Sequence, residues 1–544
     1  MKKIIALALA LIMVLGLATT VSADEPTGFT IHLNGTTQKP TAGHTYTVYQ
    51  IFVGDLEELD NEQVMTNIKY GTGYGTAGDE VTAADLAAIT DARVFADALI
   101  KNGKLKTPFG ELNASNSWTL KGVPAGYYLI QDTTEKLPDG HTRSTYIVEV
   151  VGNVDVSPKS TVVDVQKKVK DINDSTDTEL SAWQDSADHD IGDTVPYQIV
   201  SNIDDIALFK TYRVAFNDVM SKGLTYDENA VITMQYTAIN AEGKEVTGTK
   251  TVTENFAYTS KAYDGEETKY ADGTVHTFTC TDLKALVANE GNLVKATITI
   301  DYTCTLNTNA VVGAAGNPNM VNMEYDREPD VDQPDRNPGK TPWDVCIVFT
   351  FKTDVNKVHQ TGVGADGKPV YAALSGAEFK LEKFEASEDG TETFNNVKGN
   401  WATKTLVKNT AGTIFSFKGL DDGEYRITET KAPAGYNKID AIYFTVTATH
   451  DVEAADPKLN TLEATATKPD GSAYTDEEIA TGKVATFTVD KVAGQVATEV
   501  VNEAGVELPE TGGMGTTLFY IIGGLLVAGA AILLITKKRM SANY

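Results

Sequence analysis

Apolar and polar residues alternate in short runs along most of the chain, and these runs are rich in Val, Ile, Thr, Tyr and Phe. Gly, Asn and Asp separate the runs, as is usual in antiparallel β structure. Residues 294–302, with the sequence VKATITIDY, are typical of such a strand. Two segments break the pattern, because the Ala-rich residues 81–102 and the shorter residues 282–289 predict helical insertions. The pattern as a whole predicts an all-β protein built from β-sandwich domains with small helical insertions.

The N-terminus carries an apolar run of a different kind. Two lysines precede the apolar residues 4–17, and the small residues Val21-Ser22-Ala23 follow. This order of a basic region, a short apolar region and a small-residue cleavage site is typical of a secretory signal peptide. We therefore expect residues 1–23 to be removed and the protein to be exported.

The C-terminal apolar run is longer. Residues 516–535 are almost wholly apolar, and Lys537, Lys538 and Arg539 follow them. About 20 apolar residues suffice to cross the hydrocarbon core of a bilayer, and flanking basic residues stay on the cytoplasmic side. This end of the chain therefore predicts a transmembrane segment over residues 513–535 and a basic cytoplasmic tail over residues 536–544.

The charge and the cysteine content narrow the class of protein. Acidic residues number 75 and basic residues 46, which gives a formal net charge of −29. Such a charge argues against nucleic acid as a partner and fits a protein solvated outside a cell. Three cysteines are too few for a disulfide scaffold in a chain of this size. Cys280 and Cys304 either pair or remain, with Cys346, buried thiols. No Cys/His spacing indicates a metal site, so we expect no cofactor.

Two shifts in composition divide the exported chain into three parts, each large enough to bury its own core. Residues 154–161 bring Pro and Ser before a new strand, and residues 326–342 are rich in Pro, Asp and Asn. The aspartates of the second stretch fit no calcium-loop template, so we interpret it as a solvated acidic linker. The predicted order is a signal peptide (1–23), an N-terminal β domain (24–160), a second β-sandwich (161–342), a third β-sandwich (343–507), a pentapeptide motif (508–512), a transmembrane segment (513–535) and a tail (536–544).

The pentapeptide before the C-terminal apolar run carries the first functional signal. It consists of Leu508, Pro509, Glu510, Thr511 and Gly512. LPETG, an apolar segment and a basic tail, in this order, resemble the cell-wall sorting signal of Gram-positive surface proteins. The resemblance implies that a sortase cleaves between Thr511 and Gly512 and transfers Thr511, through a thioester, to an amine. It also implies a surface protein that is held only briefly in the membrane and then anchored to peptidoglycan.

The predicted third domain carries a second resemblance. Residues 373–381 (ALSGAEFKL) and 423–436 (GEYRITETKAPAGY) resemble the Cna B-type immunoglobulin-like domains of such surface proteins. The second segment matches the E-box of sortase-assembled pilins, with Ile427 in place of Leu, and its glutamate is Glu429. In that family, the E-box glutamate promotes a spontaneous amide bond between a lysine near the first strand and an asparagine on the last strand.

Strand periodicity selects the partners of Glu429, because residues two apart share one face of a strand. Lys357 and Asn502 then project, like Glu429, toward the core. The apolar residues in phase are Ile347, Phe349, Phe351 and Val355 for Lys357, Val496 and Val500 for Asn502, and Tyr425 and Ile427 for Glu429. Burial favours the neutral amine of Lys357, which is a nucleophile, and the protonated carboxyl of Glu429, which can polarise the Asn502 carbonyl, so that an amide can form. The alternative is a buried Lys-Glu ion pair beside a hydrogen-bonded Asn.

The predicted second domain repeats this arrangement with an aspartate. Residues 213–224 (RVAFNDVMSKGL) resemble the aspartate-bearing strand of isopeptide-forming fimbrial domains. Parity places Asp218 on the face of Val214 and Phe216, and Lys167 on the face of Val163, Val165 and Val169. For the acceptor, Asn319 is in phase with Val321, Met323 and Tyr325, whereas the alternative Asn322 is not. The resemblance thus implies a second isopeptide between Lys167 and Asn319, promoted by Asp218.

The N-terminal domain resembles a fimbrial N-terminal module in residues 43–50 (GHTYTVYQ) and 122–128 (GVPAGYY), and no lysine, asparagine and acid set is evident in it. At its end, residues 157–160 read SPKS and resemble the pilin motif YPKN in its Pro-Lys core. That resemblance implies that Lys159 is the amine that receives Thr511 of the next subunit. Three further lysines compete for this role: Lys167, Lys168 and Lys170.

Taken together, these motifs resemble a sortase-assembled major, or backbone, pilin with tandem Cna-type immunoglobulin-like β-sandwiches. The implied partners are a class C pilin sortase, a housekeeping sortase, other copies of the chain, minor pilins, peptidoglycan and a host surface ligand. The alternative is a monomeric wall-anchored adhesin or a minor pilin that binds a host protein or glycan. An enzyme is not expected, because the sequence has no G-x-S-x-G elbow, HExxH pair or P-loop.

Overall fold

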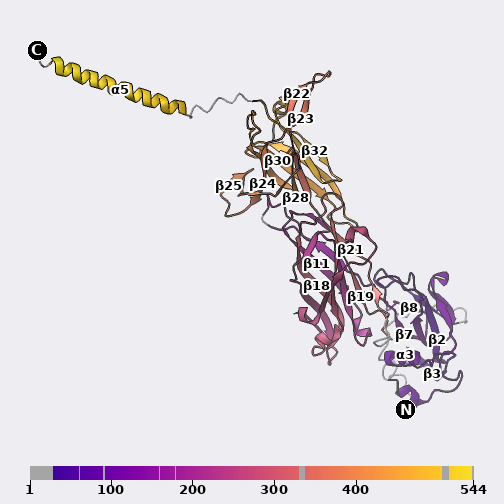
Figure 1. Ribbon diagram of the computed structural model, residues 1–544. Helices are drawn as coiled ribbons and strands as arrows, with labels where there is room; N and C mark the ends of the chain where they lie inside the picture. The colour runs from indigo at the N-terminus through magenta and orange to yellow at the C-terminus, as the bar shows by residue number, and fades with distance from the viewer. Residues whose placement is uncertain are drawn as a thin grey trace.

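The computed structural model describes residues 28–59, 62–89, 92–158, 160–177, 179–329, 337–504 and 514–541. Within these ranges, three β units follow one another along an elongated molecule, and an apolar helix projects from the C-terminal end (Figure 1). The predicted all-β class with small helical insertions is confirmed. The predicted signal peptide lies outside the described residues.

The first unit packs two sheets and two short helices around apolar side chains of both sheets. Its elements are β1 (Phe29–Leu33), β2 (Tyr46–Leu59), β3 (Glu62–Tyr70), α2 (Ala83–Ala87), α3 (Ala92–Lys101), β4 (Gly110–Leu112), η2 (Ala114–Asn116), β5 (Thr119–Val123), β6 (Gly126–Asp132), β7 (Thr145–Val150) and β8 (Val154–Val156). The strand orders are β5-β1-β8 and β3-β2-β6-β7, with β4 on β2. Helix α2 begins at Thr82, whose hydroxyl accepts from the Asp85 N–H in a capping box. Both α-helices lie in the segment predicted to be helical.

The second unit is a β-sandwich whose two sheets enclose one large apolar core. Its elements are β9 (Gln166–Val169), β10 (Ser186–Asp188), β11 (Thr194–Ile203), η3 (Ile206–Leu208), β12 (Val214–Met220), β13 (Leu224–Tyr226), β14 (Val231–Ile239), β15 (Glu245–Thr251), η4 (Thr253–Asn255), β16 (Ala257–Ala262), η5 (Thr268–Tyr270), β17 (Thr274–Cys280), η6 (Lys284–Val287), β18 (Asn292–Leu306), β19 (Asn317–Tyr325), β20 (Gly339–Lys340) and β21 (Asp344–Phe349). One sheet runs β15-β14-β18-β11-β9, and the other runs β10-β21-β19-β12-β17-β16. The three cysteines are buried free thiols.

The third unit is a second β-sandwich with its own core. Its elements are β22 (Phe351–Val363), β23 (Pro369–Ala373), β24 (Glu378–Ala386), β25 (Glu392–Phe394), β26 (Val397–Thr403), β27 (Leu406–Lys408), β28 (Ile414–Leu420), β29 (Gly423–Lys431), β30 (Ile442–His450), β31 (Leu459–Thr467), α4 (Asp476–Ala480), β32 (Phe487–Asp490) and β33 (Gln495–Val501). One sheet runs β27-β28-β22-β33-β32, and the other runs β25-β26-β24-β29-β30-β31. Strand β33 pairs with β22 in parallel, so the last strand of the unit lies beside its first long strand.

Strand β21 belongs to both sandwiches. It follows residue 342, where the sequence predicts a domain boundary, yet it pairs with β19 of the second unit. Its alternating side chains divide between two cores: Cys346 and Val348 pack in the second unit, while Ile347 and Phe349 pack in the third. The chain therefore passes from one sandwich to the next through a continuous strand and not through a flexible linker.

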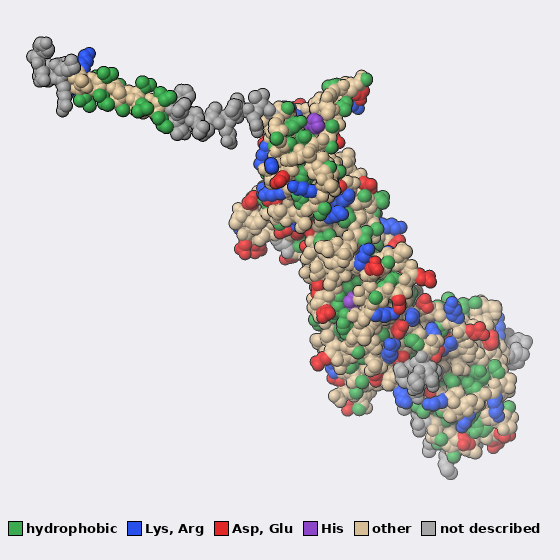
Figure 2. All heavy atoms as spheres, viewed as in Figure 1, with side chains coloured by type: hydrophobic (Ala, Val, Ile, Leu, Met, Phe, Trp, Pro, Cys, Tyr) green, Lys and Arg blue, Asp and Glu red, His purple; other side chains and the backbone are tan. Residues whose placement is uncertain are grey.

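Helix α5 (Met514–Ser541) stands apart from the β units. Residues 521–538 have a mean hydropathy of 1.8, and none of these residues is buried in the protein. Figure 2 shows apolar side chains along this helix and basic side chains near its end, where Lys537 and Lys538 lie. By length and composition, this helix can cross a membrane as predicted.

Candidate functional site

The first candidate site lies in the third unit, where a buried lysine, glutamate and asparagine converge from three strands. Lys357 on β22 is opposite Val500 on the parallel strand β33, and Asn502 follows two residues later. Glu429 projects from β29 of the facing sheet. Lys357 and Glu429 are wholly buried, and Asn502 is 2% exposed. The structure thus brings together the three residues that strand parity selected.

The Lys357 amine lies in surroundings that favour its neutral form. Its Nζ donates to the carbonyl oxygens of Val358 and Val500, at 2.8 and 2.9 Å, and a neutral amine has enough N–H groups for both contacts. Burial lowers the pKa of Lys357 to about 8, although the nearby Glu429 raises it. With this pKa, about a tenth of the amine is unprotonated at neutral pH, and this neutral fraction can act as a nucleophile.

The Glu429 carboxyl accepts hydrogen bonds from the amide nitrogen of Asn502. Asn502 Nδ2 donates to both carboxyl oxygens at 3.0 Å, and to the Asn437 carbonyl at 2.9 Å. The Ile439 N–H holds the carboxyl by donating to Oε2 at 3.0 Å. Asn502 Oδ1 is buried without a hydrogen-bond partner among the described residues. The sequence predicted that Glu429 would polarise this carbonyl, whereas the geometry places the carboxyl on the nitrogen, where it can protonate a leaving amine.

The second candidate site lies between the two sheets of the second unit. Lys167 comes from β9 of one sheet, and Asp218 and Asn319 come from β12 and β19 of the other. All three are wholly buried. Lys167 Nζ donates to Asp218 Oδ1 at 2.7 Å. The alternative acceptor, Asn322, points to the other face of β19 and accepts from the Asn217 side chain, so the geometry favours Asn319 as the parity argument did.

Tyr302 on β18 is a fourth member of this site that the sequence did not indicate. Its hydroxyl accepts from Lys167 Nζ at 2.5 Å and from Asn319 Nδ2 at 3.0 Å, and it donates to Asp218 Oδ2 at 2.5 Å. Burial and the nearby Asp218 raise the pKa of Tyr302 well above its usual value, so the hydroxyl keeps its proton. Tyr302 therefore connects lysine, acid and asparagine, and Asn319 Oδ1 has no hydrogen-bond partner among the described residues.

Aromatic rings enclose the Lys167 amine. The rings of Tyr197 and Tyr302 stack 5.6 Å apart, and the centroid of each lies 5.1 Å from Nζ. Such apolar walls exclude water and strengthen every polar interaction inside them. No metal or cofactor is needed for what these two sites can do, which is to condense a lysine amine with an asparagine amide.

The residues predicted to join one subunit to the next are a lysine at or near residue 159 and the pentapeptide motif. Lys159 and residues 508–512 lie outside the described residues. Two of the competing lysines are engaged, because Lys167 is wholly buried and Lys168 forms ion pairs with Asp185 and Glu453. The third, Lys170, lies over the Trp183 ring with its Nζ 5.0 Å from the centroid.

The first unit holds a polar cluster of another kind, which the sequence did not indicate. His44 Nδ1 lies 2.7 Å from Asp132 Oδ2, and His44 Nε2 lies 2.9 Å from His141 Nδ1. Arg143 contacts the same aspartate. This cluster contains no lysine-asparagine pair, in line with the sequence of the N-terminal domain.

Two segments of the chain match known protein families, and one known protein matches most of its length. Residues 366–458 match the SpaA prealbumin-like fold domain, and residues 500–541 match the LPXTG cell wall anchor motif. The trypsin-resistant surface T6 protein of Streptococcus pyogenes serotype M6 is 23% identical over an alignment of 562 positions, which covers 91% of this chain and 93% of that protein. The predicted resemblance to sortase-assembled backbone pilins is confirmed, as is a cell-wall-anchored location with transient membrane anchoring.

Solved structures with a similar arrangement include two pilins. The T6 backbone pilin of serotype M6 S. pyogenes covers 89% of this chain and 99% of its own, with 19% identity and a TM-score of 0.44. The major pilin SpaD from Corynebacterium diphtheriae covers 89% of this chain and 98% of its own, with 18% identity and a TM-score of 0.41.

Proposed function

We propose that this chain is the backbone subunit of a covalent pilus, in which sortase joins Thr511 of one subunit to Lys159 of the next. Within each subunit, two isopeptide bonds join Lys357 to Asn502 and Lys167 to Asn319. The observation that carries this proposal is the pair of buried lysine, carboxyl and asparagine sets in consecutive β-sandwiches. The anchor motif at residues 500–541 supports the sortase step.

In the third unit, the bond forms by attack of the neutral Lys357 amine on Asn502 Cγ. A C–N bond forms between Nζ and Cγ, the bond from Cγ to Nδ2 breaks, and Nδ2 leaves as ammonia. Glu429 takes the proton that the attacking amine loses and gives it to Nδ2, which its oxygens contact at 3.0 Å. The carboxyl is restored at the end, but Lys357 and Asn502 are consumed, so the site acts once, on its own chain.

In the second unit, Asp218 performs the same proton transfer with Tyr302 as a bridge. Asp218 contacts the Lys167 amine directly and reaches Asn319 Nδ2 through the Tyr302 hydroxyl. A proton accepted from Lys167 can therefore pass by way of Tyr302 to the leaving nitrogen. The bond that results is again an amide, with loss of one ammonia.

The two bonds reinforce the sandwiches in different ways. Lys167 and Asn319 lie on facing sheets, so their bond ties the two layers together. Lys357 and Asn502 lie on or just after neighbouring parallel strands, so their bond ties the first long strand to the chain that leads to the anchor. Each bond closes a loop of about 150 residues, which by chain entropy contributes on the order of 5 kcal/mol. Force along a pilus then passes through covalent links and not through hydrogen bonds alone.

Intact-mass spectrometry of the purified protein tests both internal bonds. Each condensation releases one ammonia of about 17 Da, so we expect a mass about 34 Da below that calculated from the sequence of the same chain. Tryptic peptides branched at Lys167 and Lys357 identify the pairs. A protein of full calculated mass would contradict both bonds.

The variant Asp218→Asn tests the bond of the second unit independently of the bond of the third unit. Asparagine keeps the size of the side chain but cannot accept the Lys167 proton, so we expect the second-unit bond to be absent. The measured mass should then lie only about 17 Da, and not about 34 Da, below the mass calculated for the variant sequence. The matched control is Asp301→Asn, because Asp301 precedes Tyr302 on β18 and accepts from Gln198 Nε2. We expect the control to retain both bonds. Complete condensation in Asp218→Asn would remove Asp218 from the mechanism.

A further inference from the structure

The second and third units meet in a joint that is rich in charged groups. Ser175 of the second unit contacts the third unit, because its hydroxyl donates to the Phe384 carbonyl and accepts from the Glu424 N–H. Gly423 is required here, because a Cβ at this residue, whose φ is +142°, would lie 2.4 Å from Ser175 Oγ. The joint is therefore closely packed, and side chains of both units are fixed in it.

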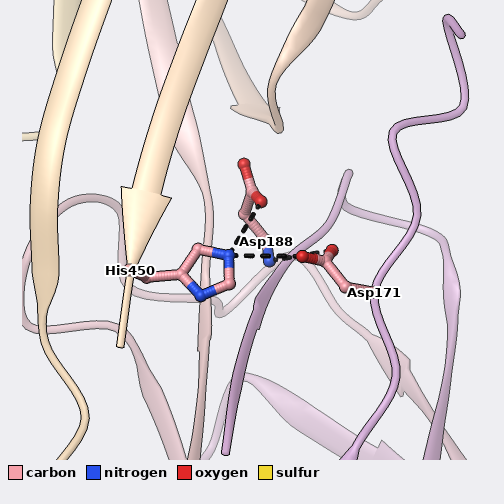
Figure 3. Close-up of side chains that lie close together, drawn as sticks. All are labelled: Asp171, Asp188 and His450. Carbon is pink, nitrogen blue, oxygen red and sulfur yellow. Dashed lines mark hydrogen bonds and ion pairs between the residues drawn. The ribbon is translucent and has the colours of Figure 1, made fainter. Parts of the chain in front are cut away.

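Two aspartates of the second unit face a histidine of the third across this joint (Figure 3). His450, at the end of β30, places Nε2 3.2 Å from Asp171 Oδ2 and 3.5 Å from Asp188 Oδ1. Asp188 and His450 are almost wholly buried, and Asp171 is partly exposed. Asp171, whose side chain is 19% exposed, is therefore the most accessible member of the cluster.

The other ring nitrogen of His450 is held by a chain of hydrogen bonds. Ser186 Oγ donates to the Asp451 carbonyl at 2.6 Å and lies 2.7 Å from His450 Nδ1. Because the serine has a single proton, Nδ1 must donate to it. Nε2 is thereby aimed at the two carboxylates, and this oriented imidazole, with its second nitrogen bonded to a fixed acceptor, is the arrangement found in histidines that bind metals.

The groups around Nε2 are acidic. Although burial lowers the pKa of His450, the hydrogen bonds to Asp171 and Asp188 raise it to about 10, so the imidazolium is the cation of this cluster until a metal ion replaces its Nε2 proton. Asp422 lies against the same group, since its N–H donates to Asp188 Oδ2 at 2.9 Å. Among the residues that the structure describes, no lysine or arginine forms an ion pair with Asp171 or Asp188. A second set of aspartates in the joint differs in this respect, because Lys383 forms ion pairs with Asp174, Asp190 and Asp421.

We propose that Asp171, Asp188 and His450 bind a divalent transition-metal ion, for which Zn²⁺ is the best match, and that this ion locks the second unit to the third. Zn²⁺ holds nitrogen and oxygen donors at about 2.0–2.2 Å in a tetrahedron, which places pairs of donors about 3.4 Å apart. The observed separations of 3.2 and 3.5 Å fit this spacing, and they exceed those of a good charge-assisted hydrogen bond. Water fills the fourth position on the exposed side.

Calorimetric titration tests the site. The full-length protein, purified in detergent and stripped with a chelator, is titrated with Zn²⁺, with Mg²⁺ and Ca²⁺ as hard-cation comparators. We expect one equivalent of Zn²⁺ to bind in preference to both. Asp171→Asn and His450→Gln should each weaken binding more than about 100-fold, since loss of a mere outer-shell partner costs 10–100-fold. X-ray absorption at the zinc edge should report one nitrogen and otherwise oxygen ligands.

The control variant is Asp193→Asn, which changes a carboxylate of the same joint that faces His189 and not His450. It should bind Zn²⁺ as the unchanged protein does. Circular dichroism of each variant verifies that the fold is retained, and Asp171→Asn is the gentlest change because Asp171 is the most exposed ligand. Absence of zinc binding in the unchanged protein would overturn the site and leave His450 as an ion-paired residue. Binding that survives both ligand variants would overturn it as well, and neither result bears on the isopeptide bonds.

Discussion

The unchanged protein is expected to form a ladder of SDS-resistant high-mass species on the cell surface, and Lys159→Ala is expected to abolish it. The change removes the amine that receives Thr511, so subunits reach the wall only as monomers. Lys167 and Lys168 are not expected to substitute, because Lys167 is wholly buried and Lys168 is held by Asp185 and Glu453. The measurement is an immunoblot of wall extracts heated in SDS, with mass spectrometry of the branched peptide that contains Thr511.

Two comparisons make this result specific. Lys170→Ala changes a lysine of the same region, whose amine lies over the Trp183 ring, and should leave the ladder intact. Thr511→Ala should remove both the ladder and the wall-bound monomer, because it blocks every sortase step. A ladder that persists in Lys159→Ala would assign the linkage to another lysine. If the unchanged protein forms no ladder, the monomeric adhesin becomes the better explanation.

The buried site residues could be predicted because a β-strand gives its side chains a period of two. Lys357 and Asn502 lie far apart in sequence, yet each is in phase with apolar residues that proved to be core, such as Val355 and Val500. The same argument separated Asn319 from Asn322, since neighbours three apart on a strand face opposite sides. Parity therefore identified which residues are buried, and the E-box indicated their chemistry.

Contacts between strands that are distant in sequence could not be predicted in this way. Tyr302 has the alternation of an ordinary core residue, and only the packing of β18 against β12 and β19 gives its hydroxyl three polar partners. The sequence also placed a boundary at residue 342, because Pro and Asp suggest a linker. Strand β21 begins at Asp344, just after that residue, and one of its faces is buried in the core of the second unit and the other in the core of the third. The joint with His450 depends on this arrangement.

Glu429→Gln is expected to leave the third unit without its internal bond and to lower its stability sharply. Glutamine cannot carry the proton from Lys357 to Asn502 Nδ2, so the measured mass should lie only about 17 Da, and not about 34 Da, below the mass calculated for the variant sequence. Loss of the cross-link removes on the order of 5 kcal/mol, which for a unit of this size corresponds to a melting temperature about 10–20 °C lower. Intact mass and differential scanning calorimetry measure the two effects, and trypsin should cut the variant at lower temperature.

Glu424→Gln is the matched control, because Glu424 lies on the same strand, is buried, and accepts from Thr445 Oγ1, a bond that glutamine can retain. It should keep the bond and most of the stability. In a double variant, Lys357→Ala is added to Glu429→Gln, and its mass should be that of a protein without the third-unit bond. The second change should not lower the free energy of unfolding by the contribution of the cross-link again, because the first change has already removed the bond. A bonded, fully stable Glu429→Gln would show that burial of Lys357 beside Asn502 suffices for the reaction, and that the carboxyl only positions the amide nitrogen.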